Sequence, residues 1–201
     1  MRTSALEKQL YSEGHFIVGV DEVGCGCVAG PVVAAAVILP LGCRIGNIAD
    51  SKSLSGAKRK TILLQMLEAN ISISWGVSTV EEVERFNVRQ ASIMAMKRAL
   101  DLLPQATYAL IDAWNVPGLE IPQKGIIKGD AIIRCIGAAS IAAKVVRDHL
   151  MCEYGREFPQ YEFERHKGYG TALHMANIKK HGLSTHHRPS FLRSVISDNA
   201  N

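Results

Sequence analysis

The sequence predicts an α/β protein in which a mixed β-sheet is flanked by helices. Apolar, β-branched runs of strand length alternate with longer amphipathic segments of helix length, which is the pattern of α/β folds. The first two runs are joined by a short glycine turn, which favours an antiparallel pair. If strands one, four and five are parallel neighbours, the sheet is mixed.

Each predicted element follows from its periodicity and from the glycine, proline and capping residues at its ends. Thr3 or Ser4 caps the first helix, and Pro40 closes the second strand. The second helix carries an apolar face that includes Leu67. The predicted strands are residues 16–20, 31–39, 71–77, 107–111 and 125–127, and the predicted helices are residues 4–10, 55–70, 81–103 and 130–154.

The composition is that of a globular protein with one core. The chain has 201 residues, of which 47% are hydrophobic and 21% are charged. We expect a single domain over residues 1–201, with an α/β core over about 1–152 and a helical extension over about 153–201. Since no apolar run is long enough to cross a bilayer and no apolar leader segment opens the chain, we expect a location in the cytoplasm. We also expect a monomer.

Cysteine and charge usage narrow the function classes. Five irregularly spaced cysteines in a chain without an export signal predict reduced thiols. Cys25, Cys27 and Cys43 lack the spacing and the fourth ligand of a usual zinc site. The net charge is +4 and the C-terminal third is mildly basic, which suits a polyanionic partner, although a solvated surface has the same composition.

The first predicted strand runs into a charged glycine turn. The apolar residues 16–20 are followed at once by Asp21 and Glu22, and then by Gly24 and Gly26. Glycines let the backbone approach a ligand closely, and two carboxylates beside backbone N–H groups can hold a divalent metal next to a phosphate. A strand followed by an ordinary polar turn explains the same residues.

Two further predicted strands also end in a carboxylate, Asp112 and Asp130. If these strands neighbour the first, their acids meet Asp21 and Glu22 at one edge of the sheet. Crowded carboxylates repel each other unless a cation holds them, and oxygen ligands favour Mg²⁺ or Mn²⁺. Two such ions can drive a phosphodiester displacement. Asp130 has an alternative role as a helix N-cap.

The geometry of a regular strand restricts the first pair of acids. Successive side chains point to opposite faces, so Asp21 and Glu22 cannot both face the same ions. Either the turn rotates Glu22 inward, or its backbone carbonyl is the ligand.

Two further patterns have both a functional and a structural explanation. Ser140, Lys144 and Asp148 form one polar stripe on a predicted helix, which any amphipathic surface helix also shows. From residue 153 onward, aromatic residues alternate with cations and glycines. Such segments can stack on sugars or bases while cations hold phosphates, and ordinary helix packing produces the same composition.

Ordered motifs along nearly the whole chain resemble the type 2 ribonucleases H (ribonuclease HII). They are GVDEVG (19–24), AGPVVAAAV (29–37), DSK (50–52), KGD (128–130), AASI (138–141), AKV with RD (143–148) and HKGYGT (166–171).

This resemblance implies a ribonuclease H-like fold with a mixed five-stranded sheet and a helical C-terminal part. It implies a metal-dependent endonuclease that cleaves at ribonucleotides in RNA/DNA hybrids and at ribonucleotides embedded in duplex DNA, with two Mg²⁺ or Mn²⁺ ions. The four metal-site and catalytic acids of the family correspond to Asp21, Glu22, Asp112 and Asp130. The expected substrate-binding residues are Gly24, Cys25, Gly26, Lys52, Ser140, Lys144 and Tyr169.

The glycine turn departs from the family pattern at one position. The family's turn usually reads Gly-Arg-Gly and senses the ribonucleotide's 2′-OH, whereas this turn reads Gly24-Cys25-Gly26. Because backbone groups of such a turn can bond the 2′-OH, we expect the function to persist without the arginine. Residues 113–115 and 131–133 also differ from the usual family residues.

Two other functions fit parts of the sequence. Gly24-x-Gly26-x-x-Ala29 after a strand has the spacing of a dinucleotide-binding oxidoreductase, but a β-rich run follows where a helix should offer its N-terminus to the pyrophosphate. The other alternative is a non-catalytic nucleic-acid-binding module with a nuclease-derived fold. A cleavage assay with Mg²⁺ or Mn²⁺ separates that module from an enzyme.

Overall fold

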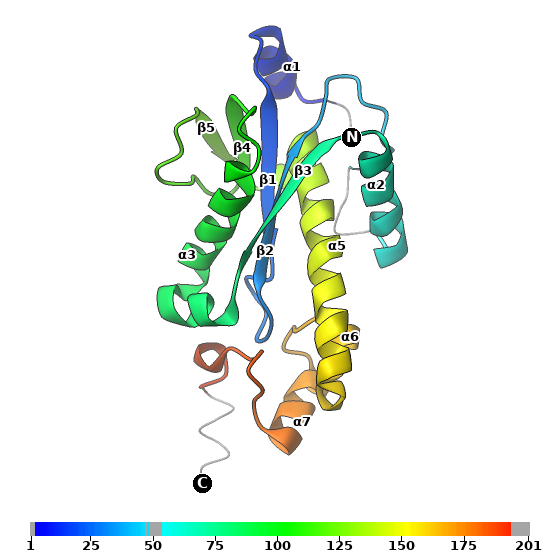
Figure 1. Ribbon diagram of the computed structural model, residues 1–201, viewed down its shortest axis with the longest axis vertical. Coiled ribbons are helices and arrows are strands. Elements are labelled where there is room, and N and C mark those ends of the chain that lie inside the picture. Colours follow the sequence, from blue (N-terminus) through cyan, green and yellow to red (C-terminus); the bar gives the residue numbers. More distant parts are fainter. Residues whose placement is uncertain (1–2, 47, 49–53, 194–201) are drawn as a thin grey trace.

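The computed structural model describes residues 3–46, 48 and 54–193, and in these a five-stranded sheet is covered by helices on both faces (Figure 1). The strands are ordered β3-β2-β1-β4-β5. The elements are α1 (Ala5–Ser12), β1 (Ile17–Val23), β2 (Val32–Ile38), α2 (Gly56–Glu68), β3 (Ser72–Ser78), α3 (Val80–Asp101), β4 (Tyr108–Asp112), β5 (Gln123–Ile126), α4 (Gly129–Ile132), α5 (Arg134–Glu157), α6 (Phe163–His166) and α7 (Ala172–His181), with 3-10 turns at Pro159–Tyr161 and Pro189–Phe191.

The strand pairing confirms the predicted mixed sheet. β2 runs antiparallel to β1 and β3, as the short glycine turn after β1 leads us to expect. β1 and β4 are parallel, and so are β4 and β5. Because β2 and not a helix follows the glycine turn, the dinucleotide-binding alternative is wrong.

Alternate residues of the central strands face two separate cores. Ile17 and Val37 pack in the core that includes residues of α1, α2 and α5, whereas Val18 and Ala36 pack against α3. Helix α5 lies very close to β1, because a Cβ at Gly19 would come within 2.2 Å of the Cys135 carbonyl carbon. This close contact fixes α5 beside the strand that carries Asp21 and Glu22.

Several element boundaries differ from the sequence prediction. β1 extends to Val23, so both acids lie inside the strand and not after it. β5 begins two residues earlier than predicted, at Gln123. The predicted helix 130–154 is split at Ile133, whose extended φ and ψ of −111° and 120° separate α4 from α5. Leu67 is exposed and does not belong to the buried face of α2.

Helix α3 contains a kink that the sequence prediction of a continuous helix over 81–103 missed. Asn87 has a φ of 66° and a ψ of 163°, which no α-helical residue adopts. Its side-chain Oδ1 accepts a hydrogen bond of 3.1 Å from the Gln90 N–H, so Asn87 acts as a cap for the second half of α3.

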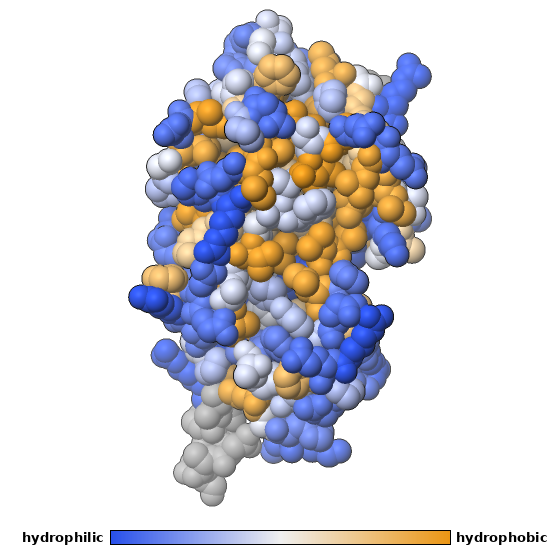
Figure 2. Space-filling model, in the orientation of Figure 1, coloured by the Kyte–Doolittle hydropathy of each residue, from blue (hydrophilic) through white to orange (hydrophobic). Residues whose placement is uncertain are grey.

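The C-terminal part is helical, as predicted, and packs on the end of α5. Phe163 and Tyr161 form a small third core with Met151 of α5. On the face shown in Figure 2, hydrophilic side chains cover the region of α6 and α7, whereas hydrophobic side chains gather higher up, across the sheet region. The last turn of α7 is basic, with Lys179 and Lys180.

Candidate active site

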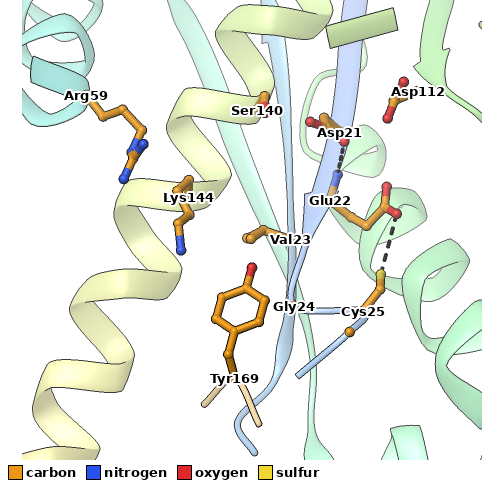
Figure 3. Close-up of a pocket in the computed structure, with 11 residues that line it drawn as sticks. Asp21, Glu22, Val23, Gly24, Cys25, Arg59, Asp112, Ser140, Lys144 and Tyr169 are labelled. Atoms are coloured by element: carbon orange, nitrogen blue, oxygen red, sulfur yellow. Dashed lines mark hydrogen bonds between the residues drawn. The ribbon is translucent and has the colours of Figure 1, made fainter. Parts of the chain in front are cut away.

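One cavity of about 500 Å³ gathers most of the residues that the sequence analysis singled out. It lies at the C-terminal end of β1, between the glycine turn, α5 and the segment that carries Tyr169 (Figure 3). The lining residues are Asp21, Glu22, Val23, Gly24, Cys25, Gly26, Arg59, Asp112, Ser140, Lys144 and Tyr169.

Asp21 is a buried carboxylate surrounded by other acids. Its side chain is only 5% exposed, and its Oδ1 accepts a hydrogen bond of 2.7 Å from the Glu22 N–H. Burial raises the pKa of Asp21 well above its usual range, the charges of Glu22 and Asp112 raise it further, and a hydrogen bond with Ser140 opposes the rise. The site therefore favours a cation beside Asp21.

Glu22 lies on the other face of β1, as the alternation of a regular strand requires. In Figure 3 its carboxylate projects away from Ser140 and toward Cys25. The Cys25 thiol donates to Glu22 Oε1 at 3.4 Å and lies 3.0 Å from Ser92 Oγ of α3. Burial and the charge of Glu22 raise the pKa of Cys25 to about 12, so this thiol stays protonated. The hydrogen bond from Cys25 therefore orients the Glu22 carboxylate. The sequence analysis did not predict this contact.

Asp112 and Asp130 are linked through the short connection between β5 and α4. Asp112 Oδ1 accepts a hydrogen bond of 2.7 Å from the Gly129 N–H. Asp130 is buried at 3% exposure but does not line the cavity. It lies inside α4, whose N-cap position is Lys128, so the helix-capping alternative for Asp130 is wrong.

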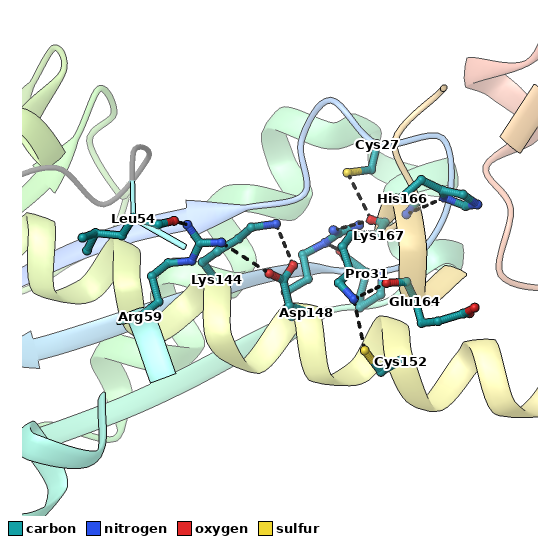
Figure 4. Close-up of polar contacts among 12 residues, drawn as sticks. Cys27, Pro31, Leu54, Arg59, Lys144, Asp148, Cys152, Glu164, His166 and Lys167 are labelled. Carbon is teal, nitrogen blue, oxygen red and sulfur yellow. Dashed lines mark hydrogen bonds and ion pairs between the residues drawn. The ribbon is translucent and has the colours of Figure 1, made fainter. Parts of the chain in front are cut away.

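Cationic side chains form the wall opposite the acids. Lys144 Nζ lies 2.6 Å from Asp148 Oδ1, and Arg59 Nη2 lies 3.9 Å from Asp148 Oδ2 (Figure 4). Lys144 Nζ also lies 5.5 Å from the centre of the Tyr169 ring. The predicted polar stripe of α5 therefore faces the cavity, and its Asp148 holds the cationic side chains of Lys144 and Arg59 in place. Sequence reasoning missed Arg59, although its place in the basic run 58–60 of α2 was a usable signal.

The remaining expectations have mixed outcomes. Lys52 lies outside the described residues. Gly24 has a φ of +105°, which glycine adopts far more readily than other residues. All five cysteines are free, as predicted. Within the described residues, no three carboxylate, histidine or cysteine side chains are gathered closely enough to form a preassembled metal site, and no helix could span a membrane.

Comparisons with known proteins agree on one family. The family model described as Ribonuclease HII matches residues 18–194. A ribonuclease HII of Desulfitobacterium hafniense is 46% identical over 187 residues, covering 92% of this chain and 72% of the relative. A ribonuclease HII of Clostridioides difficile is 43% identical over 192 residues, covering 94% of this chain and 75% of the relative.

Solved structures show the same fold at low sequence identity. The ribonuclease H2 of Pyrococcus horikoshii has a TM-score of 0.73 at 20% identity and covers 92% of this chain and 99% of that chain. Bst-RNase HIII, solved in complex with Mn²⁺, has a TM-score of 0.70 at 18% identity and covers 91% of this chain and 70% of that chain. The chain therefore belongs to the ribonuclease HII family and is a ribonuclease H-type endoribonuclease that acts on RNA/DNA hybrids.

Proposed function

We propose that this enzyme cleaves at single ribonucleotides embedded in duplex DNA as well as in RNA/DNA hybrids, and that it uses two divalent cations. In this proposal Asp21, Glu22, Asp112 and Asp130 are the metal-binding and catalytic residues. The observation that carries the proposal is the single cavity in which three of these acids meet a glycine turn and a cationic wall.

The donor set fits Mg²⁺ or Mn²⁺. Asp21, Asp112 and Asp130 offer carboxylate oxygens, and Glu22, whose carboxylate is turned toward Cys25, offers its backbone carbonyl. All of these are oxygen ligands, which hard cations prefer. Burial and neighbouring charge work against a lone ionised Asp21, and bound cations would relieve that repulsion. When bound, such a pair of ions supplies water activation and stabilisation of the leaving oxygen.

The cationic wall suits the phosphates of the substrate. Lys144 and Arg59 both line the cavity and both lie near Asp148, which orients them. Contacts to phosphate are independent of sequence and fix the position of the strand. The Ser140 hydroxyl, beside Asp21, completes this wall and can contribute a further hydrogen bond to the scissile region.

Selection of RNA over DNA requires contacts to the 2′-OH, because the phosphates are the same in both polymers. The proposed reader of the ribonucleotide consists of the glycine turn, residues 24–26, and Tyr169. The glycines bring the backbone close to the 2′-OH, and the half-exposed Tyr169 ring packs on the next sugar. Cys25 contacts Glu22 and Ser92, so its side chain is engaged with the protein while the turn's backbone recognises the substrate.

The test is cleavage of a DNA duplex that contains one ribonucleotide, with Mg²⁺, with Mn²⁺ and with EDTA. We expect metal-dependent cleavage by the unaltered enzyme and a loss of several orders of magnitude for Asp112→Asn. Asp101→Asn is the matched control, because Asp101 pairs with Lys97 on the surface of α3. Cleavage of long hybrids without cleavage of the single-ribonucleotide duplex would refute the proposed specificity.

A further inference from the structure

The segment from Ser184 to Arg188 contacts the loop that follows the glycine turn and, through His174, the backbone carbonyl of Tyr169. The Arg188 N–H donates to the Val28 carbonyl at 2.8 Å, and the Gly30 N–H donates to the His186 carbonyl at 2.8 Å. A bridge pairs Ala29 with His187. These backbone contacts attach the segment, which we call the brace, to the loop that follows the glycine turn.

Arg188 binds the glycine turn from its buried side. Its guanidinium is fully buried and donates to three carbonyls: to Gly24 and Cys27 at 2.8 Å, and to Gly30 at 2.6 and 2.9 Å. The planar fork of arginine suits several fixed acceptors at once. With these carbonyls drawn toward Arg188, the conformation of the turn that lines the cavity is fixed.

A second buried arginine packs beside the first. Arg147 of α5 donates to the carbonyls of Ala29 and Pro31, each at 3.0 Å. Burial and the charge of Arg147 lower the pKa of Arg188 to about 10, so Arg188 keeps its charge at neutral pH. Burying two desolvated cations near one another costs free energy of folding. That the protein keeps both indicates that the positions of the carbonyls they bind are important at this turn.

His187, the neighbour of Arg188, connects to Tyr169 through a defined chain of hydrogen bonds. His174 Nδ1 lies 2.9 Å from the Tyr169 carbonyl, which can only accept, so Nδ1 carries the proton. His187 Nδ1 accepts from the Ser184 N–H at 2.8 Å, so the proton of His187 is on Nε2. The two Nε2 atoms lie 3.1 Å apart, and His187 therefore donates to His174.

We propose that His187 and Arg188 are positioning residues for ribonucleotide recognition. Arg188 fixes the glycine turn, and His187 fixes Tyr169 through His174, so two adjacent residues set the distance between the two halves of the reader. This inference rests on the proposed function, because it assigns the brace a role in reading the 2′-OH. Neither residue lines the cavity, so both act through the residues that they bind.

The test compares recognition of a ribonucleotide with general DNA binding. One arm measures kcat/KM on the duplex with one ribonucleotide, and the other measures Kd for the all-DNA duplex of the same sequence. Phosphate contacts dominate the second quantity. A variant that is merely less folded lowers kcat/KM and raises the Kd for the all-DNA duplex in proportion, whereas a displaced reader lowers only kcat/KM.

Three variants make the prediction specific. His187→Leu removes the donor to His174, and His187→Gln keeps an N–H donor. Arg188→Lys keeps a charge and three N–H donors, but its single nitrogen cannot reproduce the planar fork with which Nε, Nη1 and Nη2 of Arg188 reach the separate carbonyls. We expect His187→Leu and Arg188→Lys to lose on the order of tenfold to a hundredfold in kcat/KM, the size of effect that small misplacements cause, with unchanged all-DNA affinity. His187→Gln should retain most of the activity.

The control is Tyr161→Phe, which removes a hydrogen bond of 3.0 Å to the Gly182 carbonyl in the same C-terminal part. This change should move neither quantity. Two outcomes would refute the positioning role of the brace without touching the proposed function. One is that His187→Leu and Arg188→Lys have the same kcat/KM as the unaltered enzyme, and the other is that they lose all-DNA affinity in parallel with kcat/KM. No cleavage of the single-ribonucleotide duplex by the unaltered enzyme would overturn the proposed function, and the role of the brace with it.

Discussion

Acidification should destabilise this protein through the two buried histidines that face each other, His174 and His187. Burial, with the charge of the neighbouring histidines, lowers the pKa of each from 6.5 to about 4. The unfolded chain binds protons more readily in this range, so stability is present above the unfolded pKa of 6.5 and is lost as pH falls toward 4. At about pH 5 the loss is about 2 kcal/mol for each histidine.

Urea denaturation at about pH 7.5 and about pH 5 measures this loss. EDTA should be present at both pH values, so that metal binding by the acids does not contribute. His187→Gln should reduce the pH-dependent loss of unfolding free energy by about 2 kcal/mol relative to the unaltered chain. His149→Gln, which replaces an exposed histidine of α5, is the control. If His187→Gln and the unaltered chain lose the same free energy between the two pH values, the reasoning is wrong.

Three further predictions concern the cavity. Lys144→Ala should lower the salt dependence of duplex affinity, measured as the slope of log Kd against log salt, by about one counterion. Lys97→Ala, which breaks a similar surface pair, is the control and should leave the slope unchanged. If Lys144→Ala and the unaltered enzyme have equal slopes, Lys144 only pairs with Asp148 and does not contact phosphate. Tyr169→Phe should keep most cleavage at a single ribonucleotide and Tyr169→Ala should lose much of it, and equal rates at unchanged melting temperature would remove the ring from the reader. Asp21→Asn should abolish cleavage yet raise the melting temperature in EDTA, because burial disfavours the ionised carboxylate; a lower melting temperature would contradict this.

The sequence predicted the sheet well, because its strands carry strong local signals. The β-branched runs and the glycine turn fix β1 and β2, and the acids after β-rich segments mark the parallel strands. The errors fall where local signals are weak or tertiary contacts decide. Both the break at Ile133 and the kink at Asn87 occur in sequences of good helical periodicity. Asn87 with Gln90 three residues later is a capping pattern that the periodicity outweighed, whereas no capping side chain or proline announces the break at Ile133.

The acids of the candidate site were predictable from the sequence, but the buried residues that hold the glycine turn and Tyr169 in place were not. Asp21, Glu22 and Asp112 follow from strand ends, whereas the proposed roles of Arg188 and His187 depend on tertiary contacts that no local pattern shows. Arg188 bonds Gly24, which is 164 positions away, and His187 contacts His174, which is 13 positions away. In sequence, a basic and histidine-rich tail is typical of a solvated surface. Only the fold shows that these two side chains are buried and bonded.

The contact between Arg188 and the glycine turn also sets an order of events during folding. The bond from Arg188 to the Gly24 carbonyl joins residues 164 positions apart, so it closes one of the longest loops available to this chain. Contacts of such separation form late, because the entropy of loop closure opposes them until other contacts exist. A chain emerging from the ribosome can build β1, β2 and α3 first, but the turn gains its arginine only after residue 188 has been released. In the positioning role proposed for Arg188, the glycine turn would therefore be completed last, after β1, β2 and α3 have folded.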